Sequence, residues 1–176
     1  MLAMILPSQL VVNCQRTLER KIWLNTLPQL LDKMISLWSL HLEKPFDDFG
    51  TCSWVCPVIR SDGSQAVLKL AMPHMEGKHE IQGLRYWSGR STVKLLEADE
   101  DSGAMLLERC LPGTTLRLEI GPAQDVIIAG VLRQVWGSTT EAAGLDDFRH
   151  LSQMIDFWCD ETIAQEHPLA GRRACK

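Results

Sequence analysis

Lys69 is the residue of this sequence whose surroundings most clearly demand a partner. It closes the apolar run Ala66-Val67-Leu68-Lys69, which is typical of a buried strand. A lysine there needs a carboxylate or a bound anion beside it, because an isolated buried charge is costly. Glu80 follows on a predicted helix and shares a face with Leu84 and Trp87, which points its carboxylate inward. The two residues could therefore form an ion pair that presents the lysine to an anion.

Two other interpretations of these residues stay open from the sequence. Glu76 lies one turn before Glu80 and is a competing partner for Lys69. Lys69 could also lie on an edge strand, where its stem covers apolar surface and its ammonium reaches water. In that case the lysine would have only a structural role.

Two further segments could contact a phosphorylated ligand. Gly50, Thr51, Cys52 and Ser53 are small residues whose backbone N–H groups could cap phosphates at close range, although an ordinary turn has the same composition. The residues Glu108-Arg109-Cys110 end a predicted strand and turn toward Pro112-Gly113, where backbone groups could bind a ligand. The alternative for Glu108 and Arg109 is a solvated linker pair.

Hydrophobic spacing predicts a helix first and a small sheet after it. Apolar residues three and four apart indicate an amphipathic helix from about Arg16 to Leu42, interrupted near Pro28 and ended by Pro45 and Asp47-Asp48. The turn Asp62-Gly63 between two apolar runs then indicates a hairpin. The elements after the first helix are predicted in the order β-β-α-β-β: Trp54–Arg60, Gln65–Leu70, the helix Met75–Trp87, Thr92–Leu96 and Ala104–Glu108, with a turn at Asp99–Gly103.

The last third of the chain is predicted to be helical. One apolar stripe runs from Val126 to Val135 and another from Phe148 to Trp158, and the polar segment Gly137–Asp147 joins them. The whole chain is therefore predicted to have an α+β fold, a small antiparallel sheet plus one helix followed by further helices.

Composition excludes several classes of protein. The 176 residues carry 18 Lys and Arg against 22 Asp and Glu, a net charge of −4 that argues against a nucleic-acid partner. The opening Met1–Cys14 is a poor signal peptide, and no apolar run is long enough to cross a membrane. Six cysteines without a C-x-x-C pair favour reduced thiols in the cytoplasm. Cys52 and Cys56 form at most half a metal site, so no bound metal is predicted.

Three runs of sequence resemble one kinase family. A small antiparallel sheet interrupted by a helix after the strand that carries a lysine is the plan of a kinase N-lobe. The runs Ala66–His74, His79–Trp87 and Ala104–Gly113 are similar to the aminoglycoside/hydroxyurea antibiotic resistance kinases, which include streptomycin 6-kinases. The resemblance extends from about Asp48 to Asp160.

The resemblance implies a role for each candidate site residue. Lys69 would hold ATP phosphates and Glu80 would position it, as in kinases generally. Gly50 to Ser53 would form the phosphate loop, and Glu108 to Cys110 would be the hinge that contacts adenine. The family also implies Mg²⁺ and a small-molecule acceptor, an aminoglycoside such as streptomycin or hydroxyurea.

The sequence departs from the family in one respect. Family members continue into a catalytic lobe with a His-Gly-Asp…Asn loop and a later aspartate, which supply the base and the magnesium ligands. None of the histidines here precedes Gly-Asp; they are His41, His74, His79, His150 and His167. We therefore expect a chain truncated before the catalytic loop, with no catalytic residue or metal ligand of its own and no activity alone.

This departure leads to a division of the chain and to a second hypothesis. The expected parts are a helical segment over 1–47, a nucleotide-binding N-lobe over 48–111 and the start of a helical C-lobe over 112–176. The last helices would expose apolar surface suited to self-association. The alternative to a phosphotransferase is a non-catalytic nucleotide-binding or protein-interaction module.

Overall fold

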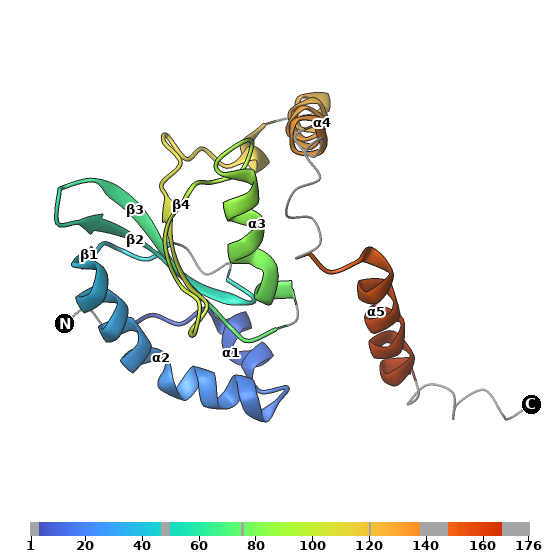
Figure 1. The fold of residues 1–176 in the computed structure, drawn as a ribbon, viewed down its shortest axis with the longest axis horizontal. Helices are drawn as coiled ribbons and strands as arrows, with labels where there is room; N and C mark the ends of the chain where they lie inside the picture. Colours follow the sequence, from blue (N-terminus) through green and yellow to red (C-terminus); the bar gives the residue numbers. More distant parts are fainter. Residues whose placement is uncertain (1–3, 47–49, 75, 120, 138–147, 167–176) are drawn as a thin grey trace, which may run out of the picture. The chain divides into compact units, whose positions relative to one another are not determined.

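The computed structural model describes residues 4–46, 50–74, 76–119, 121–137 and 148–166 (Figure 1). The chain divides into two compact units, Met1–Ala142 and Ala143–Lys176. Within the described residues, no helix is long and apolar enough to cross a membrane.

The described part of the first unit contains one antiparallel sheet in the strand order β1-β2-β3-β5-β4. Each strand runs antiparallel to its neighbours, so β3 lies inside the sheet between β2 and β5. The strands are β1 (Leu40–Leu42), β2 (Ser53–Arg60), β3 (Gln65–Ala71), β4 (Leu95–Asp99) and β5 (Ala104–Glu108). The predicted α+β fold with a small antiparallel sheet is confirmed.

The hairpin between β2 and β3 forms at the predicted Asp-Gly turn. Asp62 Oδ1 accepts hydrogen bonds from the backbone N–H of Ser64 at 2.8 Å and from its hydroxyl at 2.6 Å. Gly63 has a φ of 82°, a conformation that a residue with a side chain rarely adopts. The turn sets the register in which Val55 lies opposite Lys69.

Two N-terminal helices cover one face of the sheet. Helix α1 (Ser8–Cys14) and helix α2 (Leu18–Trp38) lie on the same side of the sheet (Figure 1). They pack on the even-numbered side chains of β2 and β3, among them Trp54 and Leu68. Alternation along a strand places these side chains on a common face. The larger part of the apolar core lies in this layer.

The prediction of one interrupted helix up to Leu42 was wrong at both points. Helix α2 continues through Pro28, because the buried Leu27 and Leu31 on either side of the proline pack on the sheet and outweigh the missing hydrogen bond. The helix ends at Trp38, where Ser39 takes a left-handed conformation with a φ of 52°. The residues that follow form strand β1, which was not predicted, and so the helix ends before Pro45.

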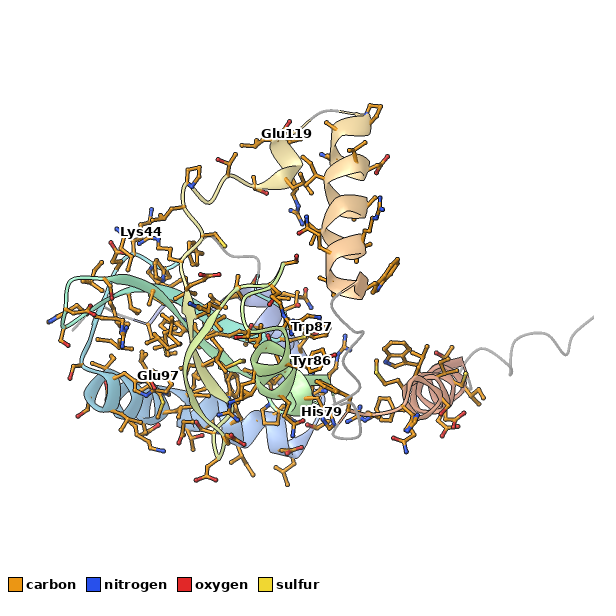
Figure 2. The ribbon with its side chains drawn as sticks, turned by 45° about the horizontal axis from the view of Figure 1, so that its top comes forward. Lys44, His79, Tyr86, Trp87, Glu97 and Glu119 are labelled. Carbon is orange, nitrogen blue, oxygen red and sulfur yellow. The ribbon has the colours of Figure 1, made fainter. Side chains whose placement is uncertain are left out.

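Helix α3 covers the opposite face of the sheet. The predicted helix Met75–Trp87 is shorter in the structure, where a 3₁₀ turn (Glu76–His79) precedes α3 (Glu80–Trp87). Ile81 packs with Met105 and Leu107 of β5 in a second, smaller cluster. The side chains at the end of α3 are shown in Figure 2.

Strand β4 begins later than predicted. Of the predicted strand Thr92–Leu96, only the last two residues belong to β4, which extends to Asp99. Residues before Leu95 are instead part of the connection from α3, where Lys94 is bound to Glu108 through both its N–H and its carbonyl. Tertiary contacts thus fix the start of this strand.

The two predicted C-terminal helices are present. A 3₁₀ turn (Leu116–Leu118) leads to α4 (Pro122–Gly137) in the first unit, and α5 (Leu151–Glu166) belongs to the second. Apart from Gly137, the predicted connection between them lies outside the described residues up to Asp147. Most large apolar side chains of both helices are exposed, among them Val126 and Trp136 in α4 and Leu151 and Ile163 in α5.

Candidate functional site

Lys69 and Glu80 form an ion pair, as their positions in the sequence predict. Lys69 Nζ donates to Glu80 Oε1, and the two side chains are 22% and 30% exposed. Strand β3 is paired on both sides, so the alternative of an edge-strand lysine is wrong. Glu80 is therefore a partner of Lys69, while the side chain of Glu76 lies outside the described residues. The Lys69 side chain is thus partly accessible to solvent.

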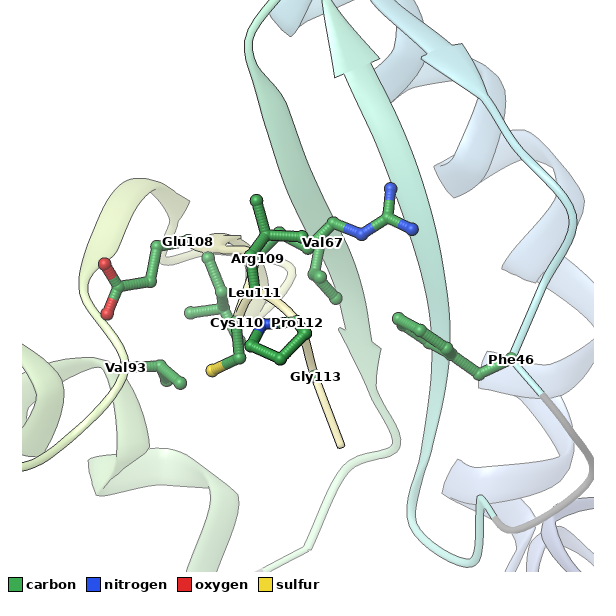
Figure 3. Close-up of a pocket in the computed structure, with 10 residues that line it drawn as sticks. Phe46, Val67, Val93, Glu108, Arg109, Cys110, Leu111, Pro112 and Gly113 are labelled. Atoms are coloured by element: carbon green, nitrogen blue, oxygen red, sulfur yellow. The ribbon is translucent and has the colours of Figure 1, made fainter. Parts of the chain in front are cut away.

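A pocket of about 320 Å³ lies beside the end of β5 and the segment that follows it. This volume suits a small organic ligand. Figure 3 shows Phe46 and Val93 on opposite sides of it. The walls are mostly apolar side chains and the backbone of the predicted hinge: Phe46, Val67, Val93, Leu107, Glu108, Arg109, Cys110, Leu111, Pro112 and Gly113.

The hinge residues are held by specific partners. Glu108 accepts a hydrogen bond from the N–H of Lys94 at 2.8 Å, and its own N–H donates to the carbonyl of Lys94 at 2.9 Å. Arg109 forms an ion pair with Glu43, which follows β1. Both side chains are therefore engaged by other segments while they stay partly exposed. Cys110 is exposed and lines the pocket.

The ion pair and the pocket lie on one face of the sheet. Val67 lines the pocket, and Lys69 lies two residues further along β3. Residues two apart on a strand share a face and are about 7 Å apart. A ligand with an apolar ring in the pocket could thus place an anionic group beside Lys69.

The small-residue segment Gly50 to Ser53 directly precedes and opens β2. Ser53 pairs with Ala71, two residues beyond Lys69 on the neighbouring strand. A Cβ at Gly50 would lie 2.6 Å from the carbonyl oxygen of Ser53, so the close approach of this backbone requires glycine. The structure thus brings this segment to the same end of β3 as Lys69.

Sequence reasoning missed three residues that shape this region. Phe46 forms a wall of the pocket, Glu43 pairs with Arg109, and Asn13 donates to the carbonyl of Thr51 at 2.9 Å. Each contact joins residues far apart in the chain, and no spacing in the sequence indicates them.

Across the described parts of the chain, no three His, Cys, Asp or Glu side chains come together as metal ligands.

Comparison with known proteins decides the family. The family model of the aminoglycoside/hydroxyurea antibiotic resistance kinases matches residues 40–161, most of the chain. This chain belongs to that family. The family resemblance seen in the sequence is thereby confirmed.

Curated relatives share slightly more than a third of the aligned residues with this chain. The streptomycin 6-kinases of Streptomyces glaucescens and Streptomyces griseus are 38% and 37% identical over 118 residues. In both cases the alignment covers 66% of this chain and 38% of the relative. A hydroxyurea phosphotransferase of Kitasatospora aureofaciens is 36% identical over 112 residues, which are 62% of this chain and 33% of the relative. The chain thus spans less than two fifths of these proteins, and no solved structure matches it.

Proposed function

We propose that this chain carries the nucleotide-binding lobe of an ATP-dependent phosphotransferase. The observation that carries the proposal is the Lys69–Glu80 ion pair. Lys69 lies two residues along β3 from Val67, which lines the pocket, and on the same face of the sheet. A nucleotide needs an apolar slot for its base and a cation at the distance of its phosphates. Residues 48–111 supply both, together with Phe46, Pro112 and Gly113 of the adjoining segments. In the proposal, 1–47 is a helical support and 112–176 is the start of a helical C-lobe.

Each site residue has a role in this proposal. The base occupies the pocket against Val67 and Leu107, and the backbone of Glu108 to Cys110 hydrogen-bonds its edge. Lys69 binds phosphate oxygens and Glu80 keeps its ammonium in place. The N–H groups of Gly50 to Ser53, with the hydroxyls of Thr51 and Ser53, cap the phosphates.

The acceptor in the proposal is a hydroxyl group of a small molecule. The names of the relatives support an aminoglycoside such as streptomycin, or hydroxyurea, as the molecule that is inactivated. We also propose the cytoplasm as the compartment, because it keeps free thiols reduced.

The chain alone is expected to be inactive in phosphoryl transfer. No histidine precedes Gly-Asp in this sequence, so the base and the magnesium ligands of the family loop have no counterpart. Phosphoryl transfer relies on those groups for positioning and charge stabilisation. Drug-dependent ADP formation by the purified chain would contradict this expectation.

ATP binding tests the proposal through the melting temperature of the full chain. A ligand that binds only the native state raises this temperature by mass action. We expect ATP to stabilise the wild type, and Lys69→Met to lose most of that stabilisation while it still melts cooperatively. Lys21→Met, which changes an exposed lysine of α2, is the matched control and should respond to ATP like the wild type. Equal responses of both variants would refute the role of Lys69.

A non-catalytic interaction module is the second candidate function. The exposed apolar side chains of α4, among them Val126 and Trp136 at 71% and 68% exposure, favour it. A stable oligomer of fixed stoichiometry in solution, with no response to ATP, would favour this function over the phosphotransferase.

A further inference from the structure

The N-terminal segment over residues 4–14 lies directly against the candidate phosphate loop. The indole N–H of Trp54 donates to the carbonyl of Ile5 at 3.0 Å, which fixes the start of the segment on β2. Leu10 and Cys14 of the same segment are fully buried in the apolar core. Because the family model begins at residue 40, this support comes from outside the matched region.

Asn13 connects the segment to the loop through an oriented amide. Gln9 lies one helical turn earlier and donates to Asn13 Oδ1 at 3.2 Å. With its oxygen engaged as acceptor, the amide directs its Nδ2 group to the carbonyl of Thr51, 2.9 Å away. The side chain of Asn13 is therefore set in one orientation by its own helix.

The hydrogen bond from Asn13 determines which way the loop backbone faces. The carbonyl of Thr51 and the N–H of Cys52 belong to one trans peptide and point in opposite directions. When Asn13 holds that carbonyl on the α1 side, the N–H of Cys52 is turned away from α1. The next carbonyl, that of Cys52, is also engaged, because it accepts the N–H of Met72 at 2.8 Å.

Such a backbone suits an anion because two of its carbonyls, those of Thr51 and Cys52, are already hydrogen-bonded elsewhere. A phosphate is bound by N–H groups and repelled by carbonyl oxygens. Close packing keeps the arrangement in place, since a Cβ at Gly50 would lie 3.1 Å from Pro7 Cγ as well as against Ser53. The N-terminal segment and the loop thus form one packed unit.

We infer that Asn13 is a positioning residue for binding the polyphosphate part of the nucleotide. The inference rests on the proposed function, in which Gly50 to Ser53 bind phosphate. Asn13 itself contacts the loop and not the nucleotide. Its effect is therefore specific to ligands that carry phosphates.

The test compares ATP with adenosine as ligands of the full chain. Asn13→Leu keeps the size of the side chain and removes its donor, and Asn25→Leu changes an exposed asparagine of α2 as a matched control. We expect Asn13→Leu to weaken ATP binding by about threefold to tenfold, the effect of one lost hydrogen bond, and to leave adenosine binding unchanged. The control should preserve both affinities.

The outcomes separate the inference from the proposed function. A wild type that binds neither ligand overturns the proposed function, and the inference with it. If the wild type binds ATP more tightly than adenosine, the proposed function stands. If the ratio of ATP affinity to adenosine affinity is then the same in Asn13→Leu, the inference alone is overturned. If Asn13→Leu does not melt cooperatively, Gln9→Leu replaces it, because that variant only releases the amide. An unchanged ratio in Gln9→Leu would then overturn the inference.

Discussion

Burial separates the cysteines within the described residues into unreactive and reactive groups. Burial raises the pKa of the Cys56 thiol to about 11, and it also raises the pKa of Cys14. Cys52, Cys110 and Cys159 are exposed. Because the thiolate is the species that reacts, alkylation should report where each cysteine lies and what covers it.

Nucleotide binding should protect Cys110 from alkylation. Cys110 lines the pocket proposed for the base, so a bound nucleotide blocks the approach of iodoacetamide. We expect saturating ATP to slow the labelling of Cys110 by at least about tenfold, because only the small fraction of protein without bound ATP can react. Mass spectrometry of peptides measures each site separately.

Cys159 and Cys56 are internal controls for this experiment. Cys159 on α5 should react at the same rate with and without ATP, and Cys56 should stay unlabelled in both cases. Equal labelling of Cys110 in both samples, in a protein whose melting temperature responds to ATP, would locate the nucleotide elsewhere.

At the scale of elements, an acidic side chain connects α2 to the sheet. Asp99 at the end of β4 accepts hydrogen bonds from the hydroxyl of Ser102 and, at 3.1 Å, from Lys33 of α2. The Ser102 hydroxyl, followed by Lys33, lowers the pKa of Asp99 below its ordinary value. A carboxyl with a lowered pKa stabilises the native state above its ordinary pKa of about 3.9 and loses that contribution as the pH falls through the lowered value.

Asp99→Asn should reduce the acid sensitivity of the fold. The wild type is expected to lose melting temperature as the pH falls below about 4, and the variant to lose less in that range. At neutral pH the variant should be less stable by under about 1 kcal/mol, as for partly exposed ion pairs. Thermal melts across this pH range measure both effects. Asp101→Asn, in the exposed turn beside it, is the control, and identical acid profiles for Asp99→Asn and wild type would contradict the prediction.

The same elements show which features of the fold the sequence could predict. Strands β2 and β3 were predictable because the Asp62-Gly63 turn and the apolar runs on both sides give one consistent local signal. Strand β1 was not, because Leu40 and Leu42 continue the apolar spacing of α2. Only pairing with β2 and the left-handed Ser39 separate strand from helix there.

The candidate site divides in the same way. Lys69 and Glu80 were predictable because a charge within an apolar strand requires a partner of opposite charge, and Glu80 lies on the helix that follows the strand. Phe46 and Asn13 were not, because their roles depend on contacts between distant segments, the pocket for Phe46 and the Thr51 carbonyl for Asn13. Local patterns contain no information on such contacts.

At the scale of the whole molecule, α4 presents apolar side chains that its own unit does not cover. They lie around much of the helix and are each at least 41% exposed: Val126, Ile127, Ile128, Val131, Leu132 and Trp136. A helix that is apolar on most sides is normally buried against further protein. An exposed cluster of this kind favours association between copies of the chain.

Charges on α4 should therefore reduce self-association and leave the fold intact. We expect the double variant Ile128→Glu and Leu132→Glu to shift the mass measured by light scattering toward the monomer. Its melting temperature should stay close to that of the wild type, because exposed positions change stability by under about 0.5 kcal/mol. Leu18→Glu with Ile22→Glu places the same two charges on exposed apolar positions of α2 and should leave association unchanged. If both double variants reduce the mass equally, net charge and not the α4 surface controls association, since added charge of either origin opposes it.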